Sequence, residues 1–401
     1  MAIILVTDAR LGSAVAVIRS LAAMGHRVVA VDSDTGAAGL RSRATWRRHV
    51  LPAGGTEPEK YAAGIRTLVE RLGIDIVIPI TDESILPLMA ASEPLGAIVG
   101  AASPAALEAA HDKSRTIDLA REVGVPVPDT VRVANRADAI AAGEELGWPV
   151  VLKPRRSRVI GQDGRSHALE VTYANTSAEL GARADAALPL GDLIVQRYHP
   201  GDGVGVELLM HEGRPLAAFQ HRRLREVPVT GGASAYRESV ALDGALLDHA
   251  VRLLRAMAWT GLAMVEFKVS GSEAHLLEVN GRIWGSLPLA VKSGMDFPGR
   301  YVELLLSGPP AGEGIATAYR VGVRSRNLRL ELVWIASVLR GERRYPYLPA
   351  PSRRDGLAAL AGLAIPSSEH DVLSLADPVP GLVDAVAAIQ HVLFKALGTR
   401  G

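Results

Sequence analysis

Residues 261–282 read GLAMVEFKVSGSEAHLLEVNGR, in which two largely apolar segments are separated by a short polar turn. The segments at 262–269 and 274–280 have the length of strands, and the turn is centred near Ser272. This pattern predicts an antiparallel hairpin. The hairpin is the most informative segment for the fold, because it contains acidic and amide residues at positions that a simple sheet would fill with apolar side chains.

Three residues of the hairpin, Glu266, Glu278 and Asn280, are polar within apolar strands and therefore need partners. Positions two apart share one face of a strand, and the turn places Glu266 about opposite Glu278. Oxygen ligands converging on one face suit Mg²⁺. The alternative interpretation is that the two glutamates pair with Lys268 and Arg282 on a solvated face.

Lysine is rare in this chain, which has six lysines among 44 basic residues. Lys153 ends the apolar segment WPVVLKP, and the cationic loop 155–166 follows it. That loop contains Arg155, Arg156, Arg158, Gly161 and Gly164. Such a loop suits a polyphosphate, although a charged surface loop after an edge strand has the same composition. Lys113, taken alone, is interpreted as a residue in the first turn of a helix beside its cap, Asp112.

Composition excludes several classes of protein. The chain has 401 residues, enough for two or three domains, and 44 basic against 43 acidic residues. A net charge of +1 provides no global field for nucleic acid, and the absence of cysteine removes disulfides and thiolate metal sites. We find no signal-peptide pattern and no apolar stretch long enough to span a membrane, so we expect a cytoplasmic location.

The N-terminal pattern alternates between strand and helix, which predicts a doubly wound parallel sheet. The expected elements are strand 3–6, helix 13–24, strand 28–31, helix 57–72, strand 74–80 and strand 97–99. The first turn, residues 7–12, lacks the G-x-G-x-x-G spacing of a dinucleotide site. The chain also lacks the P-loop, G-x-S-x-G and H-E-x-x-H motifs.

The rest of the chain predicts two further units and a helical end. A helix at 113–124 is followed by strand 130–134, helix 136–146, strand 149–153, strand 167–174, helix 177–187 and strand 193–198. A hairpin at 204–210 and 214–221 and a helix at 243–258 precede the hairpin described above. After Pro309-Pro310 we expect mostly amphipathic helices, at 327–340 and 383–397. Such helices can bind membrane surfaces, but they more often pack on their own core.

In this order the segments resemble the ATP-grasp superfamily. The resemblance covers about residues 1–305, and the segments EVNGR, IPITDE and HRRLREVPVTGG are most similar to the carbamoyl-phosphate synthetase-like and carboxylate-amine ligase branch. The motifs that carry it are Asp112-Lys113, the strand lysine in Val151-Leu152-Lys153-Pro154, the hinge strand Val195-Gln196-Arg197-Tyr198, and Glu266 with Glu278-Val279-Asn280.

The resemblance implies a fold of α/β and α+β class. We expect an N-terminal doubly wound pre-ATP-grasp α/β domain at 1–111, a small ATP-grasp lobe at 112–192 and a large ATP-grasp lobe at 193–308. A mostly helical C-terminal region would occupy 309–401.

The resemblance also implies ATP and Mg²⁺ as cofactors, with Mn²⁺ as a substitute metal. Lys113 and Lys153 would contact the phosphates, and the backbone of Gln196, Arg197 and Tyr198 would hold adenine. Asp202 is the ribose candidate. The metal ligands would be Glu266, Glu278 and Asn280. Arg282, two residues beyond Asn280, would face the transferring phosphoryl group, where a guanidinium stabilises negative charge.

The activity implied by the resemblance is that of an ATP-dependent carboxylate-amine ligase, which forms an acyl phosphate and releases ADP and phosphate. Guanidinium groups match carboxylates, so we expect the acyl substrate at Arg222, Arg223 or Arg225 and at the Gly231-Gly232 loop. These arginines could instead be a solvated strand edge. Asp82 and Glu83 could bind a cationic or hydroxylated substrate group, or simply cap a helix.

The alternatives are an ATP-dependent kinase or carboxylase on the same scaffold, or a nucleotide-binding subunit without turnover. The expected partners are a small-molecule carboxylate, such as an amino acid, and an amine. We expect no nucleic acid and no membrane association, and a homodimer is compatible with the sequence.

Overall fold

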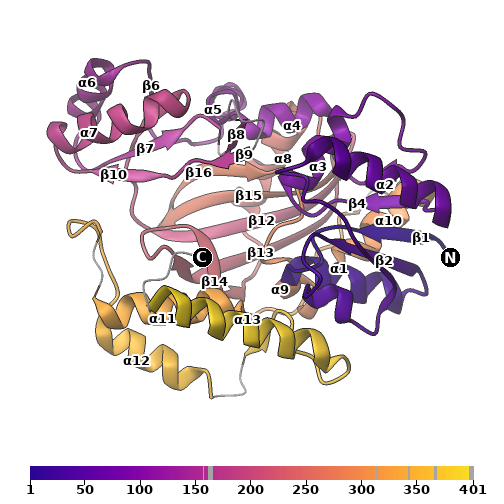
Figure 1. The fold of residues 1–401 in the computed structure, drawn as a ribbon. Coiled ribbons are helices and arrows are strands. Elements are labelled where there is room, and N and C mark those ends of the chain that lie inside the picture. The colour runs from indigo at the N-terminus through magenta and orange to yellow at the C-terminus, as the bar shows by residue number, and fades with distance from the viewer. Residues whose placement is uncertain (157, 161–165, 313, 342–343, 365–367, 397–401) are drawn as a thin grey trace.

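The computed structural model describes residues 1–156, 158–160, 166–312, 314–341, 344–364 and 368–396 (Figure 1). It has a mixed α/β architecture built around three main sheets. No helix within the described residues combines the length and the apolarity needed to cross a bilayer.

The N-terminal sheet is wholly parallel and has the strand order β3-β2-β1-β4-β5. Its strands β1, β2 and β4 are apolar runs that helices bury on both faces, the usual pattern for parallel strands. The elements are β1 (Ile3–Val6), α1 (Gly12–Ala23), β2 (Arg27–Asp32), η1 (Ala38–Arg41), β3 (Thr45–Val50), α2 (Pro58–Leu72), β4 (Ile76–Ile78), α3 (Asp82–Ala90), β5 (Ile98–Val99) and α4 (Pro104–His111). Strand β3 was not predicted, because TWRRHV is an exposed edge strand with little apolar pattern.

A second, antiparallel sheet has the order β10-β7-β11-β6. Its elements are α5 (Lys113–Glu122), β6 (Thr130–Val133), α6 (Arg136–Leu146), β7 (Val150–Pro154), β8 (Arg158–Ile160), β9 (Ser166–Ala168), β10 (Thr172–Ala174), α7 (Ser177–Ala187), η2 (Leu188–Leu190) and β11 (Leu193–Arg197). The strand predicted at 167–174 is wrong as one element. Its first part pairs with β8 and its second part pairs with β7, so the chain changes partner between them.

The largest sheet has seven strands in the order β16-β15-β12-β13-β14-β17-β18. The elements are β12 (Asp202–His211), β13 (Arg214–Val227), β14 (Ala233–Ser239), α8 (Gly244–Ala256), β15 (Gly261–Ser270), β16 (Glu273–Asn280), α9 (Leu287–Lys292), α10 (Phe297–Ser307) and β17 (Arg324–Arg326). Both predicted hairpins are present, as β12-β13 and β15-β16. Strand β13 runs six residues beyond its predicted end at 221, and it pairs there with β14, which was not predicted.

Apolar side chains on the two faces of the large sheet enter two different cores. Phe219 and Met264 face the N-terminal sheet and pack in one cluster with Val6. Val206 and Phe267 face the other way and form a second cluster with helices α4 and α8. The large sheet is therefore fixed on both faces, and its polar positions can be held in a constant geometry.

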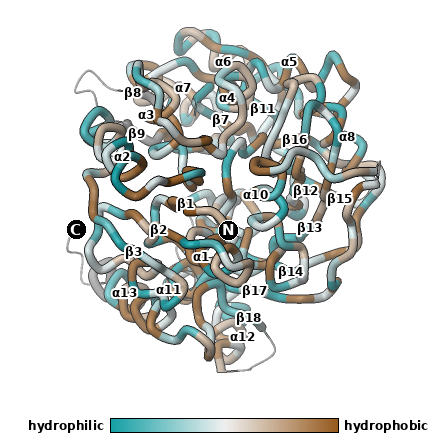
Figure 2. The backbone as a smooth tube through the Cα atoms, turned by 90° about the vertical axis from the view of Figure 1, so that its right-hand side faces the viewer, coloured by the Kyte–Doolittle hydropathy of each residue, from teal (hydrophilic) through white to brown (hydrophobic). Residues whose placement is uncertain are grey.

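The C-terminal helices lie together at the side of the molecule away from α6 and α7 in both views (Figure 1 and Figure 2). They are α11 (Leu328–Arg340), α12 (Arg353–Gly362) and α13 (Pro378–Ala396), with β18 (Glu369–His370) before the last. This region joins the large sheet through β17 and β18. The fully buried Arg237 of β14 donates to Asp371 at 2.5 Å, which fixes the junction. The predicted domain boundaries stay predictions.

Candidate functional site

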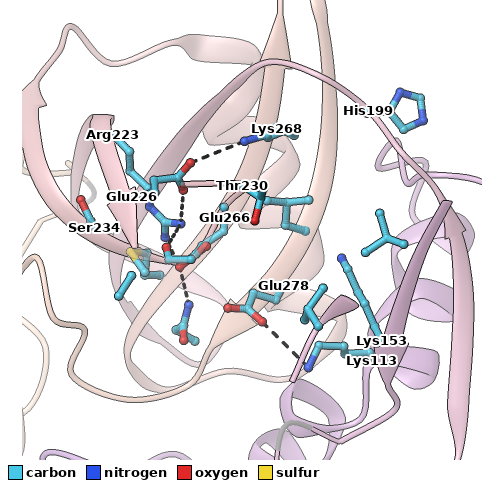
Figure 3. Close-up of a pocket in the computed structure, with 18 of the residues that line it drawn as sticks. Lys113, Lys153, His199, Arg223, Glu226, Thr230, Ser234, Glu266, Lys268 and Glu278 are labelled. Atoms are coloured by element: carbon cyan, nitrogen blue, oxygen red, sulfur yellow. Dashed lines mark hydrogen bonds and ion pairs between the residues drawn. The ribbon is translucent and has the colours of Figure 1, made fainter. Parts of the chain in front are cut away.

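A cavity of about 520 Å³ lies between the antiparallel sheet of β7, β10 and β11 and the strands β13 to β16 of the large sheet (Figure 3). It contains most of the residues that the sequence singled out. Those that line it are Lys113, Lys153, Gln196, Arg197, Tyr198, Arg223, Gly231, Gly232, Glu266, Glu278, Asn280 and Arg282.

Two lysines from different elements meet in this cavity. Lys153 is near the end of β7 and only 9% exposed, and Lys113 begins α5. The Nζ atom of Lys113 lies 3.9 Å from Oε2 of Glu278 (Figure 3). Burial, together with the charge of Lys113, lowers the pKa of Lys153 to about 8. A polyanion entering here would stabilise the protonated form of Lys153, so the site favours phosphate.

Asp112 fixes the segment that carries Lys113. Its carboxylate caps α5 by accepting from the backbone N–H of Ser114 at 3.0 Å, and it also accepts from Arg155 Nε at 2.9 Å. The backbone N–H of Lys113 donates to the carbonyl of Arg155 at 2.9 Å. These contacts tie the start of α5 to the chain just beyond Lys153, so the positions of the two lysines depend on each other.

The arginines of loop 155–166 that the structure describes bind neighbouring acids. Arg155 pairs with Asp112 and Asp192, and Arg156 pairs with Glu108. Gly161 and Gly164 lie outside the described residues, and nothing is described of the Arg158 side chain. The predicted contact of this loop with phosphate stays a prediction.

The hairpin of β15 and β16 presents its polar residues as predicted. Glu266 pairs directly opposite Glu278, and Asn280 Nδ2 donates to Glu266 Oε1 at 2.8 Å. Burial raises the pKa of Glu266. For Glu278, burial is outweighed by the charges of Lys113 and Lys153, which lower its pKa. The alternative pairing differs from the structure: among the described residues Glu266 pairs with Arg223 and Glu278 with Lys113, instead of with Lys268 and Arg282.

The donor set suits a hard cation that shares its ligands with phosphate. Two carboxylates and one side-chain amide lie together, and the Glu278 side chain is 37% exposed. In the described part of the chain, no group of three or more histidine, cysteine, aspartate or glutamate side chains could hold a metal ion. Mg²⁺ is commonly bound by one or two carboxylates plus substrate phosphates, so this set fits it.

Arg223 lies at the centre of an ionic cluster beside the hairpin. It pairs with Glu266 and, at 3.1 Å, with Glu226, and it donates to the carbonyl of Gly232 at 3.0 Å (Figure 3). Glu226 also pairs with Lys268 at 3.6 Å. Arg223 therefore holds the Gly231-Gly232 loop against the metal candidates.

Asp82 lies beside the main cavity, in a smaller one of about 190 Å³ that Lys113, Glu278 and Arg282 also line. Its carboxylate accepts from Arg282 Nε at 3.2 Å and contacts His111 Nε2 at 3.1 Å. Burial would raise its pKa, but the hydrogen bond to His111 and the charge of Arg282 lower it to about 2. Asp82 thus holds Arg282 in place. His111 was not predicted, and a single histidine before Asp112 gave no signal.

The structure does not bring five of the predicted residues into the main cavity, counting Asp82 in the smaller cavity beside it. Arg222 points to the opposite face of β13 and pairs with Glu238 and Asp202, so neither Arg222 nor Asp202 lines it. Arg225 pairs with Glu331 of α11, because the register of β13 shifts between Arg223 and Arg225. Glu83 faces the N-terminal sheet instead. Of the three arginines expected at the acyl substrate, only Arg223 lines the main cavity, because strand alternation turns Arg222 away and the register shift turns Arg225 away.

Two backbone donors of the hinge strand are already used within the fold, which restricts how this strand could bind adenine. The backbone N–H of Arg197 donates to Asp129 at 2.9 Å, and that of Tyr198 donates to Pro149 at 3.3 Å. These two donors are committed within the fold, so contacts to adenine would have to use other atoms of the segment. The side chains of Tyr173, His199, Thr230, Ser234, Trp284 and Asn327 also line the cavity and were not predicted, since no motif marks them.

A family model and several curated proteins match parts of this chain. A family model described as "ATP-grasp in the biosynthetic pathway with Ter operon" matches residues 190–327. The carbamoyl phosphate synthase large chain of Myxococcus xanthus is 26% identical over 245 residues, covering 54% of this chain and 22% of that protein. The corresponding protein of Thermomicrobium roseum is 27% identical over 322 residues, covering 73% and 29%. The chain thus spans between a fifth and a third of the length of these relatives.

Solved structures show the same fold. Biotin carboxylase from Campylobacter jejuni aligns with a TM-score of 0.63 and 17% identity, over 80% of this chain and 74% of that one. An L-amino acid ligase from Bacillus licheniformis gives 0.56 and 16%, over 77% and 75%. The biotin carboxylase domain of 2-oxoglutarate carboxylase from Hydrogenobacter thermophilus, solved with MgADP and bicarbonate, gives 0.62 and 16%, over 80% and 73%. The resemblance to the ATP-grasp superfamily is confirmed.

Proposed function

We propose that this chain is an ATP-dependent carboxylate-amine ligase that works through an acyl phosphate and releases ADP and phosphate. The observation that carries the proposal is the meeting of Lys113 and Lys153 with Glu278 and Asn280 across one cavity. Positive groups and candidate metal ligands that line one cavity can bind a polyphosphate together with its metal ion. The ligase-like and carboxylase-like neighbours of the fold support the same reaction class.

Each group has a role that its position supports. Lys153 and Lys113 would neutralise the α- and β-phosphates, and Arg282, held by Asp82, would face the phosphoryl group in transfer. Glu266, Glu278 and Asn280 would hold Mg²⁺, which supplies charge neutralisation between the nucleotide and an anionic acid. Arg223 and the Gly231-Gly232 loop that it fixes would bind the carboxylate.

The chemistry proceeds in two balanced steps. A carboxylate oxygen attacks the γ-phosphorus, and the bond from that phosphorus to the bridging oxygen breaks, so that its electron pair leaves with ADP. The amine nitrogen then attacks the acyl carbon. The carbon–oxygen bond breaks, phosphate departs with an oxygen that began in the acid, and the nitrogen loses a proton. The cavity's part is to hold the two anions close in the correct orientation.

A kinase, a carboxylase and a scaffold without turnover remain the alternatives, and each would leave different products. A hydroxyl kinase keeps the phosphoryl group on its product, a carboxylase requires bicarbonate, and a scaffold releases nothing above background. Substrates and partners are part of the proposal, because the chain matches only part of each curated relative.

The test begins with ADP release across a matrix of carboxylates and amines, with and without bicarbonate. For any productive pair, the acid is then labelled with ¹⁸O in its carboxylate and the released inorganic phosphate is analysed by mass spectrometry. We expect one labelled oxygen in the phosphate and ADP, not AMP, as the nucleotide product. Unlabelled phosphate from a productive reaction would overturn the acyl-phosphate mechanism.

A further inference from the structure

A second cavity of about 280 Å³ lies next to the candidate site, and we call it the C-terminal pocket. Its walls come from the β13–β14 turn, from α11 and from the segment after α11. The lining is largely apolar and aromatic: Val171, Tyr173, Val227, Pro228, Val229, Thr230, Gly231, Val333, Trp334, Ala336, Ser337, Arg340, Arg344, Tyr345, Pro349 and Ala350. The roles considered so far do not use this pocket.

The C-terminal pocket and the main cavity are neighbours that share a wall. Val171, Tyr173, Thr230 and Gly231 line both. Helix α11 passes along both as well. Its first turn, with Leu330, lines the main cavity, and its later turns line the C-terminal pocket. A molecule bound at the Gly231 loop therefore lies directly beside the C-terminal pocket.

The shared wall is held by specific contacts. The hydroxyl of Tyr173 donates to the carbonyl of Thr230 at 2.9 Å, which joins β10 to the β13–β14 turn. The Tyr345 ring is buried, lies edge-on to Tyr173 with centroids 5.0 Å apart, and is covered by the Arg183 guanidinium at 4.9 Å. The segment after α11 thus packs against the antiparallel sheet through these two rings.

The chemistry of the lining defines the ligand. Valine, proline, alanine and tryptophan side chains offer contact area but few hydrogen bonds, so an apolar group is what they bind favourably. The charged groups are at the edge, where Arg340 and Arg344 are exposed and Arg344 is paired with Glu170. The buried hydroxyl of Tyr345 has no hydrogen-bond partner among the described residues. The Gly231-Gly232 loop is the element that we assign to the acid, and it forms the wall between the cavities. The group that reaches across it belongs to the acid and not to the nucleotide.

We propose that the C-terminal pocket binds the apolar part of the carboxylate substrate, so that the preferred acid carries an apolar group about as large as the biggest amino-acid side chains. The inference rests on the proposed function, because it takes the carboxylate to be bound at Arg223 and the Gly231 loop. It adds the substrate class, and it assigns the choice of substrate to the C-terminal region.

The experiment uses the full chain and two series of unbranched acids, acetate to octanoate and glycine to norleucine. Binding to the ATP-free protein is measured by calorimetry, and ADP release is measured separately with hydroxylamine as a general amine. We expect one series to bind about three- to fourfold more tightly per added methylene until the pocket is filled.

Two matched substitutions locate the effect. Ala336 lines the pocket, whereas Ala358 is exposed on α12, so Ala336→Phe fills the pocket and Ala358→Phe adds the same ring elsewhere. We expect Ala336→Phe to weaken binding of the longest acids at least tenfold and to leave the shortest within twofold. Ala358→Phe should change neither. Val333→Ala should move the optimum to a longer acid.

The outcomes separate the two proposals. Chain-length dependence that Ala336→Phe leaves intact, or no chain-length dependence in either series, overturns the inference. Tight binding of apolar acids that is lost in Ala336→Phe supports the pocket even where no ADP is released, and in that case the ligase proposal fails alone. ADP release that depends on short acids only supports the ligase proposal and refutes the pocket.

Discussion

Two regions of the molecule have features of nucleotide sites: the edge of the N-terminal sheet, and the cavity between the other two sheets. At the first region the charged groups are paired with each other and leave little space, whereas at the second they line an open volume. At the N-terminal edge, Arg10 pairs with Asp32 at 3.0 Å, and Asp8 accepts hydrogen bonds from Thr81 and Ser84. The space left is about 10 Å³, and a Cβ added at Gly54 would lie 2.2 Å from the carbonyl oxygen of Glu83.

The larger cavity has open volume, and the charge of Lys153 in it is only partly compensated. Lys153 is almost buried, and within the described residues its ammonium forms no ion pair. The comparison teaches that a parallel sheet with the right topology does not by itself make a nucleotide site. A buried charge beside open volume is a stronger indication of a ligand site, because an oppositely charged ligand stabilises such a charge most.

The largest effect that would test this comparison is expected from Lys153→Met. Substitution should lower ATP turnover at least 100-fold, because the phosphate contact is lost, while Lys113→Ala should weaken nucleotide binding. The exposed Lys60→Ala should change neither. Calorimetry measures ATP binding, and ADP release measures turnover. If both cavity variants bind ATP with wild-type affinity, the assignment of the two lysines as phosphate contacts is wrong.

The same variant should not be less stable. The folded pKa of Lys153 is about 8 against an ordinary 10.5, so the unfolded chain binds its proton more tightly. The cost of burying the charged form is complete below pH 8 and disappears as pH rises through 10.5, so the wild type gains stability over that window. At pH 7 Lys153→Met should raise the free energy of unfolding by up to about 3 kcal/mol.

Glu278→Gln should have the next largest effect. A neutral amide cannot replace a carboxylate between a metal and phosphates, so we expect turnover to fall between tenfold and 100-fold. The Mg²⁺ concentration for half-maximal rate should also rise. Glu273→Gln, at the exposed start of the same strand, is the control, and Asn280→Asp should be milder. Normal turnover of Glu278→Gln at low Mg²⁺ would mean that the hairpin is structural.

Arg222 and Arg223 are neighbours on β13 whose side chains point to opposite faces, so variants of the two test which face of the strand binds substrate. Arg223→Ala should raise the KM for the acid about tenfold and change that for ATP much less, because it removes charge-assisted hydrogen bonds to the acid. It should also lower the melting temperature, because it removes one ion-pair partner from each of the partly or fully buried carboxylates of Glu226 and Glu266. Arg222→Ala should leave both KM values within twofold. Equal effects of the two variants would contradict the assigned faces.

Proton uptake offers a smaller but direct signal from the cavity. Near pH 8 about half of Lys153 is neutral in the ATP-free protein, and bound phosphate should raise its pKa. ATP binding should therefore take up as much as about half a proton at pH 8. Calorimetry in buffers of different ionisation enthalpy measures it. Uptake that persists in Lys153→Met would assign the proton to another group.

The smallest effect is expected at the N-terminal edge. Arg10→Ala removes a partly exposed ion pair with Asp32, so a loss of stability of about 1 kcal/mol is expected. The KM for ATP should stay within twofold of the wild-type value. A larger change in ATP kinetics would show that this edge contributes to the nucleotide site after all.

Much of the fold follows from local pattern. The hairpin at 261–280 was predicted from alternation around a turn, and so was the pairing of Glu266 opposite Glu278. Lys113 and Lys153 were picked out as site candidates because lysine is rare in this chain, and because one follows a helix cap and the other ends a strand. These features are local because strand alternation and capping are set by neighbouring residues. Strand β14, ASAYRES, was missed because it has little apolar alternation, although it pairs with the preceding strand β13. The break between β9 and β10 was missed because β9 pairs with β8 whereas β10 pairs with β7.

By itself, the sequence determined which side chains carry charge and which strands would hold them. Only the tertiary structure decided which partner each of those charges has. It sends Arg223 toward Glu266, Arg222 toward Glu238 and Arg225 toward α11, although the three lie within four positions. It also places Asp82 against Arg282, 200 residues away. The physical reason is that a buried charge is stabilised by whatever lies within a few ångströms, and that neighbour is chosen by packing and strand register.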